Sequence, residues 1–223
     1  MSATLSFPNV FVDASKALNH DEARISAPWL VAFRESQQHL LEQCLLPNRK
    51  TEDWRYSSRH LKMSDAIAKP LTTAADSILN NDFVDLDGYL VVFVNGHFAA
   101  DKSRLPQNAE LTIKSFSDLS NEEAEQVVSS AMHSGENTPT TSPTLFPFAA
   151  INSAYLSDGV YISVPKNIKV DKPIQVQFHS EGEGTASARV FLATEQGAEA
   201  TLIEEFSGNT QTESLTTSAT DIL

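Results

Sequence analysis

The chain has 223 residues, of which 41% are hydrophobic and 20% are charged, a composition typical of an ordinary soluble globular protein. A chain of this length buries roughly 70% of its unfolded surface, enough for a core without disulfides. The formal net charge of −13 repels phosphate backbones and anionic lipids, so nucleic acid and membrane are excluded as preferred partners.

The N-terminal segment contains neither a leader nor an anchor pattern. Its first basic residue is Lys16, and no apolar run in the chain approaches the roughly 20 residues that a membrane helix needs. We therefore predict a cytoplasmic protein. Cys44 is the only cysteine, so no intrachain disulfide can form.

The first strong helical pattern begins with Ser26 as the expected cap and Pro28 in the first turn, and it stops before Pro47. Cys44 lies on its apolar face and is interpreted as a small core residue rather than a reactive thiol. Ser120 and Glu123 form a capping box for a second helix that reaches about His133. Residues 134–144 are rich in Pro, Ser and Thr and are predicted to be a linker.

The pattern becomes strand-like in two regions. Residues 90–94 form an apolar run, and Asn95-Gly96 after it predicts a tight hairpin turn. After a short helix that is expected to end at Gly159 as a left-handed cap, strands are predicted to begin near residues 160, 174, 188 and 200. A last strand is predicted from Thr216 to Leu223.

Strands at intervals of about 12–14 residues fit a sandwich, a barrel or a stacked solenoid. Two features favour the solenoid. The strand at residues 188–194 is apolar on both faces, and the sequence stops inside an apparent strand without the polar cap that solenoids need. The sequence is therefore expected to be one portion of a longer protein.

A search for catalytic motifs finds no phosphate-binding loop, no dinucleotide fingerprint, no nucleophile elbow and no zinc-protease motif. The six histidines are far apart in sequence, and no pair has zinc-ligand spacing. Glu204 and Glu205 are adjacent on a strand and point to opposite faces, which suits an acid/base pair badly. We predict that the chain is not an enzyme, with no catalytic residue and no metal ligand.

The densest cluster of charged and aromatic residues lies between Pro47 and Tyr56. If this segment is helical, Arg49 and Asp53 are i,i+4 neighbours, as are Glu52 and Tyr56, while Trp54 can anchor apolar surface. We interpret the segment as a structural clamp rather than a ligand-binding site.

This segment resembles the N-terminal signature of the SufD family of iron–sulfur cluster assembly subunits, and residues 151–160 resemble a second family segment. The pairing of Glu52 and Asp53 with Trp54 is closer to SufD than to its paralogue SufB. Val164-Pro165, Lys172-Pro173-Ile174 and residues 193–204 continue the match in order. The signature residues, expected to be structural, are Pro47, Arg49, Lys50, Glu52, Asp53, Trp54, Tyr56, Asn152, Asp158 and Gly159.

The resemblance implies an α+β protein with a helical N-terminal domain and a small β-hairpin region at residues 1–145. The start of a right-handed parallel β-helix, an incomplete core domain, is expected at residues 146–223. It also implies a non-catalytic scaffold that pairs with SufB-like subunits and binds SufC-like subunits through parts mostly missing here. A single cysteine falls short of the roughly four thiolates that hold a cluster, so the cluster is implied for the complex and not for this chain alone.

Three further expectations remain from the sequence. The open end of the β-helix is expected to support self-association, because unpaired strand edges are templates for pairing. One alternative function is a β-solenoid acting on polysaccharide, which would need clustered carboxylates or basic residues on one face. The other is a free-standing protein-interaction module.

Overall fold

The structure is a computed structural model that describes residues 9–20, 27–60, 63–71, 86–107, 111–136, 147–208 and 211–223. Its helices are α1 (Asn9–Ala17), α2 (Pro28–Leu41), α3 (Asn121–Glu136) and α4 (Pro147–Ala154). Its strands are β1 (Tyr89–Val94), β2 (His97–Phe98), β3 (Thr112–Ser115), β4 (Asp158–Val164), β5 (Ile174–Ser180), β6 (Gly184–Thr194), β7 (Leu202–Gly208) and β8 (Ser214–Ile222). Short 3-10 helices lie at Leu18–His20, Glu52–Trp54, Ser58–His60, Ala66–Ala68, Ala100–Lys102 and Phe116–Asp118.

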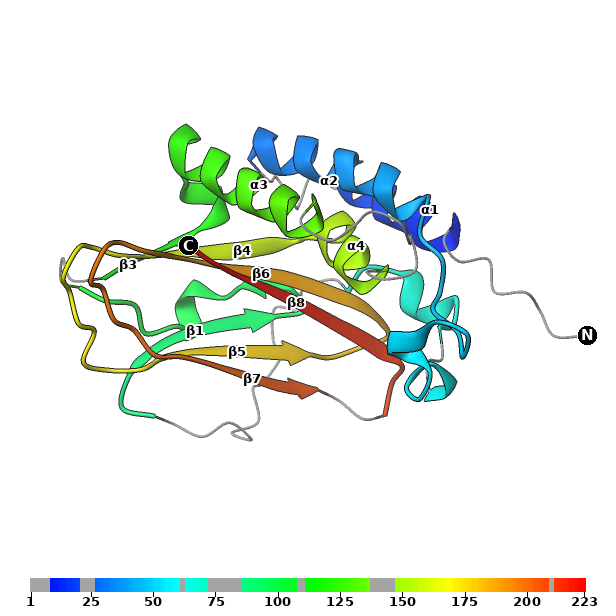
Figure 1. The fold of residues 1–223 in the computed structure, drawn as a ribbon. Coiled ribbons are helices and arrows are strands. Elements are labelled where there is room, and N and C mark those ends of the chain that lie inside the picture. Colours follow the sequence, from blue (N-terminus) through cyan, green and yellow to red (C-terminus); the bar gives the residue numbers. More distant parts are fainter. Residues whose placement is uncertain are drawn as a thin grey trace, which may run out of the picture.

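The strands form two sheets that face each other, with helices over the outer side of one of them (Figure 1). Sheet 1 has the order β2-β1-β5-β7, and sheet 2 has the order β3-β4-β6-β8. From β4 to β8, successive strands alternate between the two sheets, and β6, β7 and β8 each pair in parallel with the strand two positions earlier. In each sheet the edge strand on the other side, β2 or β3, is antiparallel to its neighbour.

The predicted start of a right-handed parallel β-helix is therefore wrong. The described strands form two four-stranded sheets of mixed direction and do not close into a solenoid. Stacked coils of a parallel β-helix have parallel neighbours only, whereas β1 with β2 and β3 with β4 run antiparallel. The chain is α+β, built from two mixed sheets and a helical layer.

The apolar pattern of β6 explains why the sequence favoured a solenoid. Val190 and Leu192 on its inner face belong to the core between the sheets. Phe191 on its outer face packs with Leu30 and Phe33 of α2. Burial of both faces follows from the helices that cover sheet 2, so it does not distinguish this fold from stacked coils.

The core between the sheets is a single apolar cluster. It includes Val91 and Phe93 of β1, Val160 and Ile162 of β4, and Val176 of β5, all fully buried.

Three phenylalanines at matched positions of β1, β5 and β7 form a ladder within sheet 1. The ring centroids of Phe93 and Phe178 are 5.2 Å apart, and those of Phe178 and Phe206 are 4.8 Å apart. Both pairs are stacked, with interplanar angles of 6° and 12°. The ladder thus extends the core as far as the outermost strand of the sheet.

Two of the local predictions are confirmed. Asn95 and Gly96 have positive φ of 51° and 83°, and they connect β1 and β2 as an antiparallel hairpin. The capping box is also present, because the Glu123 N–H donates to Ser120 Oγ (3.3 Å) and the Ser120 N–H donates to a Glu123 carboxylate oxygen (2.9 Å).

Other local predictions need correction or fall outside the described residues. The expected cap Ser26 and most of the predicted linker at residues 134–144 lie outside them, and Ala27 occupies the N-cap position of α2. Gly159 is not a helix cap: α4 ends at Ala154, and Gly159 lies within β4 without positive φ. The division between domains at residue 145 stays a prediction; β1, before that point, pairs with β5, after it.

No helix among the described residues has both the length and the apolar character that a bilayer crossing requires.

Candidate functional site

The segment after α2 folds as a series of tight turns rather than as an α-helix. Asn48 Oδ1 accepts a hydrogen bond from the Lys50 N–H at 2.9 Å, and the Thr51 N–H donates to the Asn48 carbonyl at 2.9 Å. The Trp54 N–H then donates to the Thr51 carbonyl, which opens the 3-10 helix Glu52–Trp54. The α-helical spacing considered for Arg49 with Asp53 and for Glu52 with Tyr56 is therefore absent.

One side of this segment is anchored in the protein. Pro47 is buried, and the half-buried Trp54 ring lies 5.4 Å from the ring of Phe148, near the start of α4. A half-buried aromatic pair of this kind fixes a loop against a helix. This placement supports the interpretation of Trp54 as a clamp.

The other side of the segment faces solvent. Arg49, Lys50, Glu52 and Arg55 are exposed, and Tyr56 is 76% exposed. For Asp53 only the backbone is described, within the 3-10 helix. The signature therefore divides into a buried anchor, Pro47 and Trp54, and an exposed set of charged and aromatic side chains.

Asn152 is the second signature position, and it ties α4 to sheet 2. It is 1% exposed, and its Nδ2 donates to the carbonyls of Ala188 on β6 (3.0 Å) and Thr217 on β8 (3.1 Å). A buried amide with such partners fixes the position of a helix over a sheet. Asn152 is placed where it stabilises structure.

Asp158 and Gly159 begin β4 and join the two sheets. Asp158 Oδ2 accepts a hydrogen bond from the Phe98 N–H on β2 (3.2 Å), while Oδ1 accepts from the Gly159 N–H (2.7 Å) and from Ser115 Oγ (3.3 Å). Burial nevertheless raises the pKa of Asp158 to about 6, because desolvation outweighs these donors.

Gly159 has a steric role. A Cβ atom at this position would lie 2.4 Å from the ring of Phe116, which is fully buried between α2 and α3. Only a residue without a side chain allows this ring to lie against β4.

The structure thus brings the signature residues to α4 and its two ends and not to a common pocket. Trp54 contacts the start of α4, Asn152 anchors its middle, and Asp158 and Gly159 follow its end. Their shared effect is to hold α4 between the helices and sheet 2.

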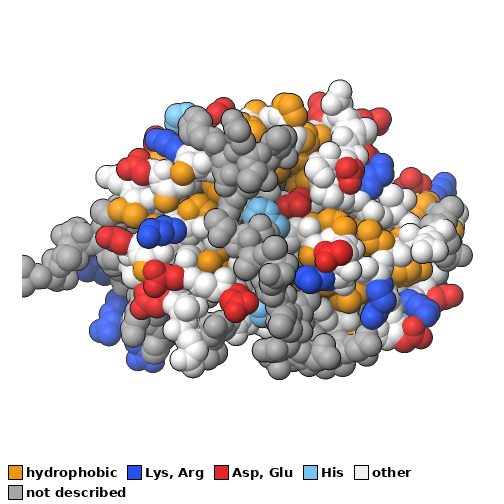
Figure 2. All heavy atoms as spheres, turned by 180° about the vertical axis from the view of Figure 1, so that it is seen from behind, with side chains coloured by type: hydrophobic (Ala, Val, Ile, Leu, Met, Phe, Trp, Pro, Cys, Tyr) orange, Lys and Arg blue, Asp and Glu red, His pale blue; other side chains and the backbone are white. Residues whose placement is uncertain are grey.

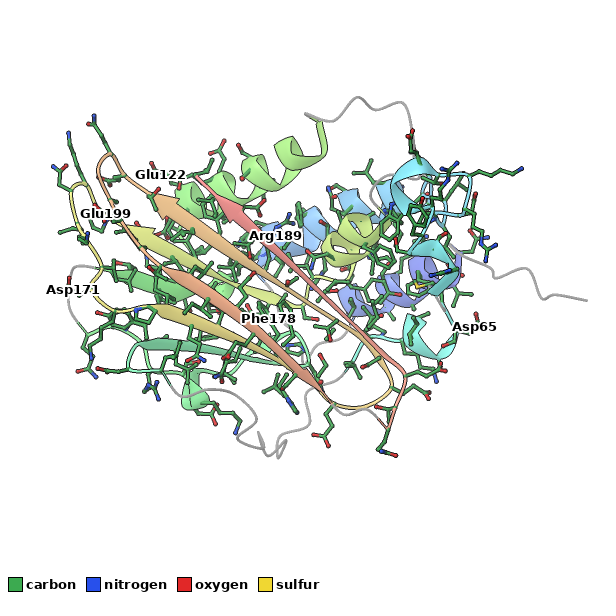
Figure 3. All side chains as sticks on the ribbon, turned by 60° about the horizontal axis from the view of Figure 1, so that its bottom comes forward. Asp65, Glu122, Asp171, Phe178, Arg189 and Glu199 are labelled. Carbon is green, nitrogen blue, oxygen red and sulfur yellow. The ribbon has the colours of Figure 1, made fainter. Side chains whose placement is uncertain are left out.

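Three residues that complete this arrangement were not among the predicted site residues. The Tyr155 hydroxyl lies 2.8 Å from the Phe11 carbonyl and 2.6 Å from the Ala68 carbonyl, and burial raises its pKa. Arg189 on β6, labelled in Figure 3, forms a buried ion pair with Asp221 on β8. An arginine within an otherwise uncharged strand was the available sequence signal.

The described residues do not fit a metal or cluster site. Within them, no group of three or more His, Cys, Asp or Glu side chains is arranged to hold a metal ion. Cys44 is buried, its Sγ lies 3.5 Å from the Leu40 carbonyl, and burial raises the pKa of the thiol. Because thiolates are the ligands of iron–sulfur clusters, a buried neutral thiol is poorly suited to that role.

A second exposed surface lies at the outer edges of β7 and β8, which we call the open edge. Both strands are terminal in their sheets, and Phe206, Ile222 and Leu223 are 53%, 65% and 59% exposed. Glu204 is exposed there and accepts a hydrogen bond from Thr220 Oγ1 across the two sheets (2.5 Å).

Comparison with known proteins matches the family described as SufBD protein N-terminal region to residues 1–176. An iron–sulfur cluster assembly SufBD family protein of Synechocystis is 24% identical over 185 residues, covering 79% of this chain and 39% of that relative. SufBD family proteins of Staphylococcus aureus (strain MRSA252) and Staphylococcus haemolyticus are 43% and 40% identical over 58 residues, 26% of this chain and 12% of each relative.

Proposed function

The chain belongs to the SufBD family, and we propose that it is a non-catalytic, cytoplasmic scaffold subunit of iron–sulfur cluster assembly, of the SufD type. In this role it pairs with a SufB-like subunit and works with a SufC-like subunit. The cluster is cargo of the assembled complex and is not a resident group of this chain. The chain spans about two-fifths of the Synechocystis relative, so these partners are proposed for the whole protein.

The observation that supports this proposal is where the signature residues lie and what they contact. Asn152, Asp158 and Gly159 are engaged in holding α4 and the sheets together, while Arg49, Lys50, Glu52 and Arg55 lie on the surface. Catalysis requires polar groups that converge on a substrate, whereas these side chains hold elements together or face solvent. This arrangement favours a protein that presents surfaces to partners.

Self-association through the open edge belongs to the same proposal. The outer backbone groups of β7 and β8 face no further strand among the described residues, and Phe206 ends the aromatic ladder with half of its surface exposed. An edge of this kind is a template for strand pairing, and a second copy of the chain offers the same edge.

The test is co-purification. The whole protein that contains this chain, tagged and co-expressed with the SufB-like and SufC-like subunits of its own genome, is expected to be recovered in a complex with both. The Cys44→Ala variant is expected to assemble equally well and to leave the iron and sulfide content of the complex unchanged.

Two results would contradict the proposal. Recovery of the tagged whole protein without either subunit would remove the scaffold role. Loss of iron from an otherwise intact Cys44→Ala complex would show that this thiol is a ligand.

A further inference from the structure

The exposed large hydrophobic side chains of the described residues fall into two groups. One group, at the open edge, is Phe206, Ile222 and Leu223; the other is Leu40, Leu45 and Tyr56. The second group lies in one continuous stretch, residues 40–56, that also contains the exposed signature residues. Exposed apolar and cationic side chains therefore share one stretch of the chain with the half-buried Trp54. We call Arg49, Lys50, Arg55 and Tyr56 the signature surface.

Several cations elsewhere among the described residues form ion pairs, unlike those of the signature surface. Among the ion pairs of the described residues, none includes Arg49, Lys50 or Arg55. Six cations elsewhere form ion pairs with carboxylates: Lys16–Glu42, Lys102–Asp101, Lys114–Glu123, Lys169–Glu199, Lys172–Asp87 and Arg189–Asp221. The signature surface thus presents positive charge that the rest of the described protein does not neutralise by direct pairing.

This local charge is opposite in sign to that of the whole chain. Residues 47–59 contain four cations and two acidic residues, so the segment is positive within a protein whose formal charge is −13. On the face shown in Figure 2, acidic and basic side chains are interspersed rather than segregated. Since charges separated by more than about 8 Å are largely screened at physiological ionic strength, a ligand bound here responds mainly to the local cations.

The composition of the surface favours an acidic polypeptide over a nucleic acid. A long polyphosphate would extend beyond the segment and meet the acidic remainder of the protein. Glu52 and Asp53 also interrupt the row of cations, which does not match a uniform phosphate backbone. A short segment that alternates carboxylates with apolar side chains matches both the guanidinium groups and the exposed ring of Tyr56.

We propose that the signature surface is a docking site for an acidic, partly apolar segment of a partner protein. Trp54 holds the site in place by packing on Phe148, while Arg49, Lys50 and Arg55 pair with carboxylates of the partner. Tyr56 packs on apolar side chains between those carboxylates. This inference deepens the proposed function, on which it rests, by giving the chemistry of one partner contact.

The direct test measures binding of a fluorescent peptide of alternating glutamate and leucine to the purified chain. Reversal of the three cations in the variant Arg49→Glu/Lys50→Glu/Arg55→Glu is expected to weaken binding by more than about tenfold, since like charges then face each other. Tyr56→Ala is expected to weaken it by a smaller factor.

The matched control is Lys166→Glu/Lys169→Glu/Lys172→Glu, which makes the same change in net charge within another short exposed stretch. That stretch surrounds Asp171. In Figure 3 it lies at the opposite end of the sheets from Asp65, which follows the signature segment in the sequence. Binding by this variant is expected to match that of the wild type. Equal loss in both triple variants would overturn the proposal, because net charge alone would then explain binding.

Competition distinguishes the classes of ligand. An unlabelled single-stranded oligonucleotide is expected to displace the peptide poorly, and displacement at lower concentration than the unlabelled peptide itself would overturn the proposal in favour of a nucleic-acid site.

Co-purification then separates this inference from the proposed function. Recovery of the SufB-like and SufC-like subunits by wild type, together with absence of peptide binding, would refute the docking site and leave the scaffold role standing.

Discussion

The buried ion pair between Arg189 and Asp221 allows the sharpest stability prediction. Arg189 Nε lies 2.6 Å from Asp221 Oδ2, and the two side chains are only 5% and 8% exposed. Arg189 Nη1 also donates to Ser153 Oγ on α4 at 3.2 Å, and its guanidinium lies 5.9 Å from the Phe33 ring on α2. The pair therefore connects two strands of sheet 2 with two helices.

Removal of one partner leaves a buried charge without its counterion. Asp221→Leu is expected to lower the free energy of unfolding by about 3–5 kcal/mol, and Arg189→Met by a similar amount. Replacement of both, in Arg189→Met/Asp221→Leu, is expected to cost less than either single change, since apolar pairs of similar volume are tolerated at such sites.

Urea unfolding of the four proteins, followed by circular dichroism, measures these differences as a double-mutant cycle. Single-variant losses below about 1 kcal/mol would show that the pair behaves as a solvated surface contact. A double variant whose loss equals the sum of the two single losses would show that the side chains do not interact. Either result would refute the assignment of this pair as the link between β6, β8 and the helices.

Three further predictions follow from single residues. The pKa of Asp158 is raised from 3.8 to about 6 by burial, so the folded state binds more protons between these values and this contribution to stability is lost as pH rises through about 6. Relative to Asp158→Asn, the wild type should lose about 3 kcal/mol of unfolding free energy between about pH 4 and pH 7, and parallel pH profiles would contradict this. Trp54→Ala should cost about 2 kcal/mol, since the ring is half-buried on Phe148, whereas the exposed control Tyr56→Ala should cost less than about 0.5 kcal/mol; equal losses would remove the anchor role. Phe206→Asp should shift the 223-residue chain toward monomer in light scattering, and an unchanged mass distribution would exclude the open edge as its self-association surface.

Local features were predictable because neighbouring residues alone determine them. The Asn95-Gly96 turn needs two residues that accept positive φ, and the capping box needs only Ser120 and Glu123 at a spacing of three. The signature segment stays a predicted structural clamp, an interpretation made from its composition. Its conformation was not predicted, because the Asn48 side chain bonds to the backbone of Lys50 and starts a turn in place of a helix.

Features that depend on strand register and on layers were not predictable. Arg189 and Asp221 are 32 residues apart, and only the parallel pairing of β6 with β8 brings them together. The β-helix prediction failed for a related reason, since a strand buried on both faces looks the same under helices as within stacked coils. The hydrophobic period of a strand indicates that one of its faces is buried. It does not indicate whether helices or further strands bury that face.

The central proposal, that the whole protein containing this SufBD family chain acts by binding other subunits, is tested most directly by native mass spectrometry of that protein mixed with its SufB-like subunit. We predict a species at the sum of the two masses that persists in the Cys44→Ala variant. Spectra that contain only the separate proteins, under conditions in which both are folded, would contradict the scaffold role.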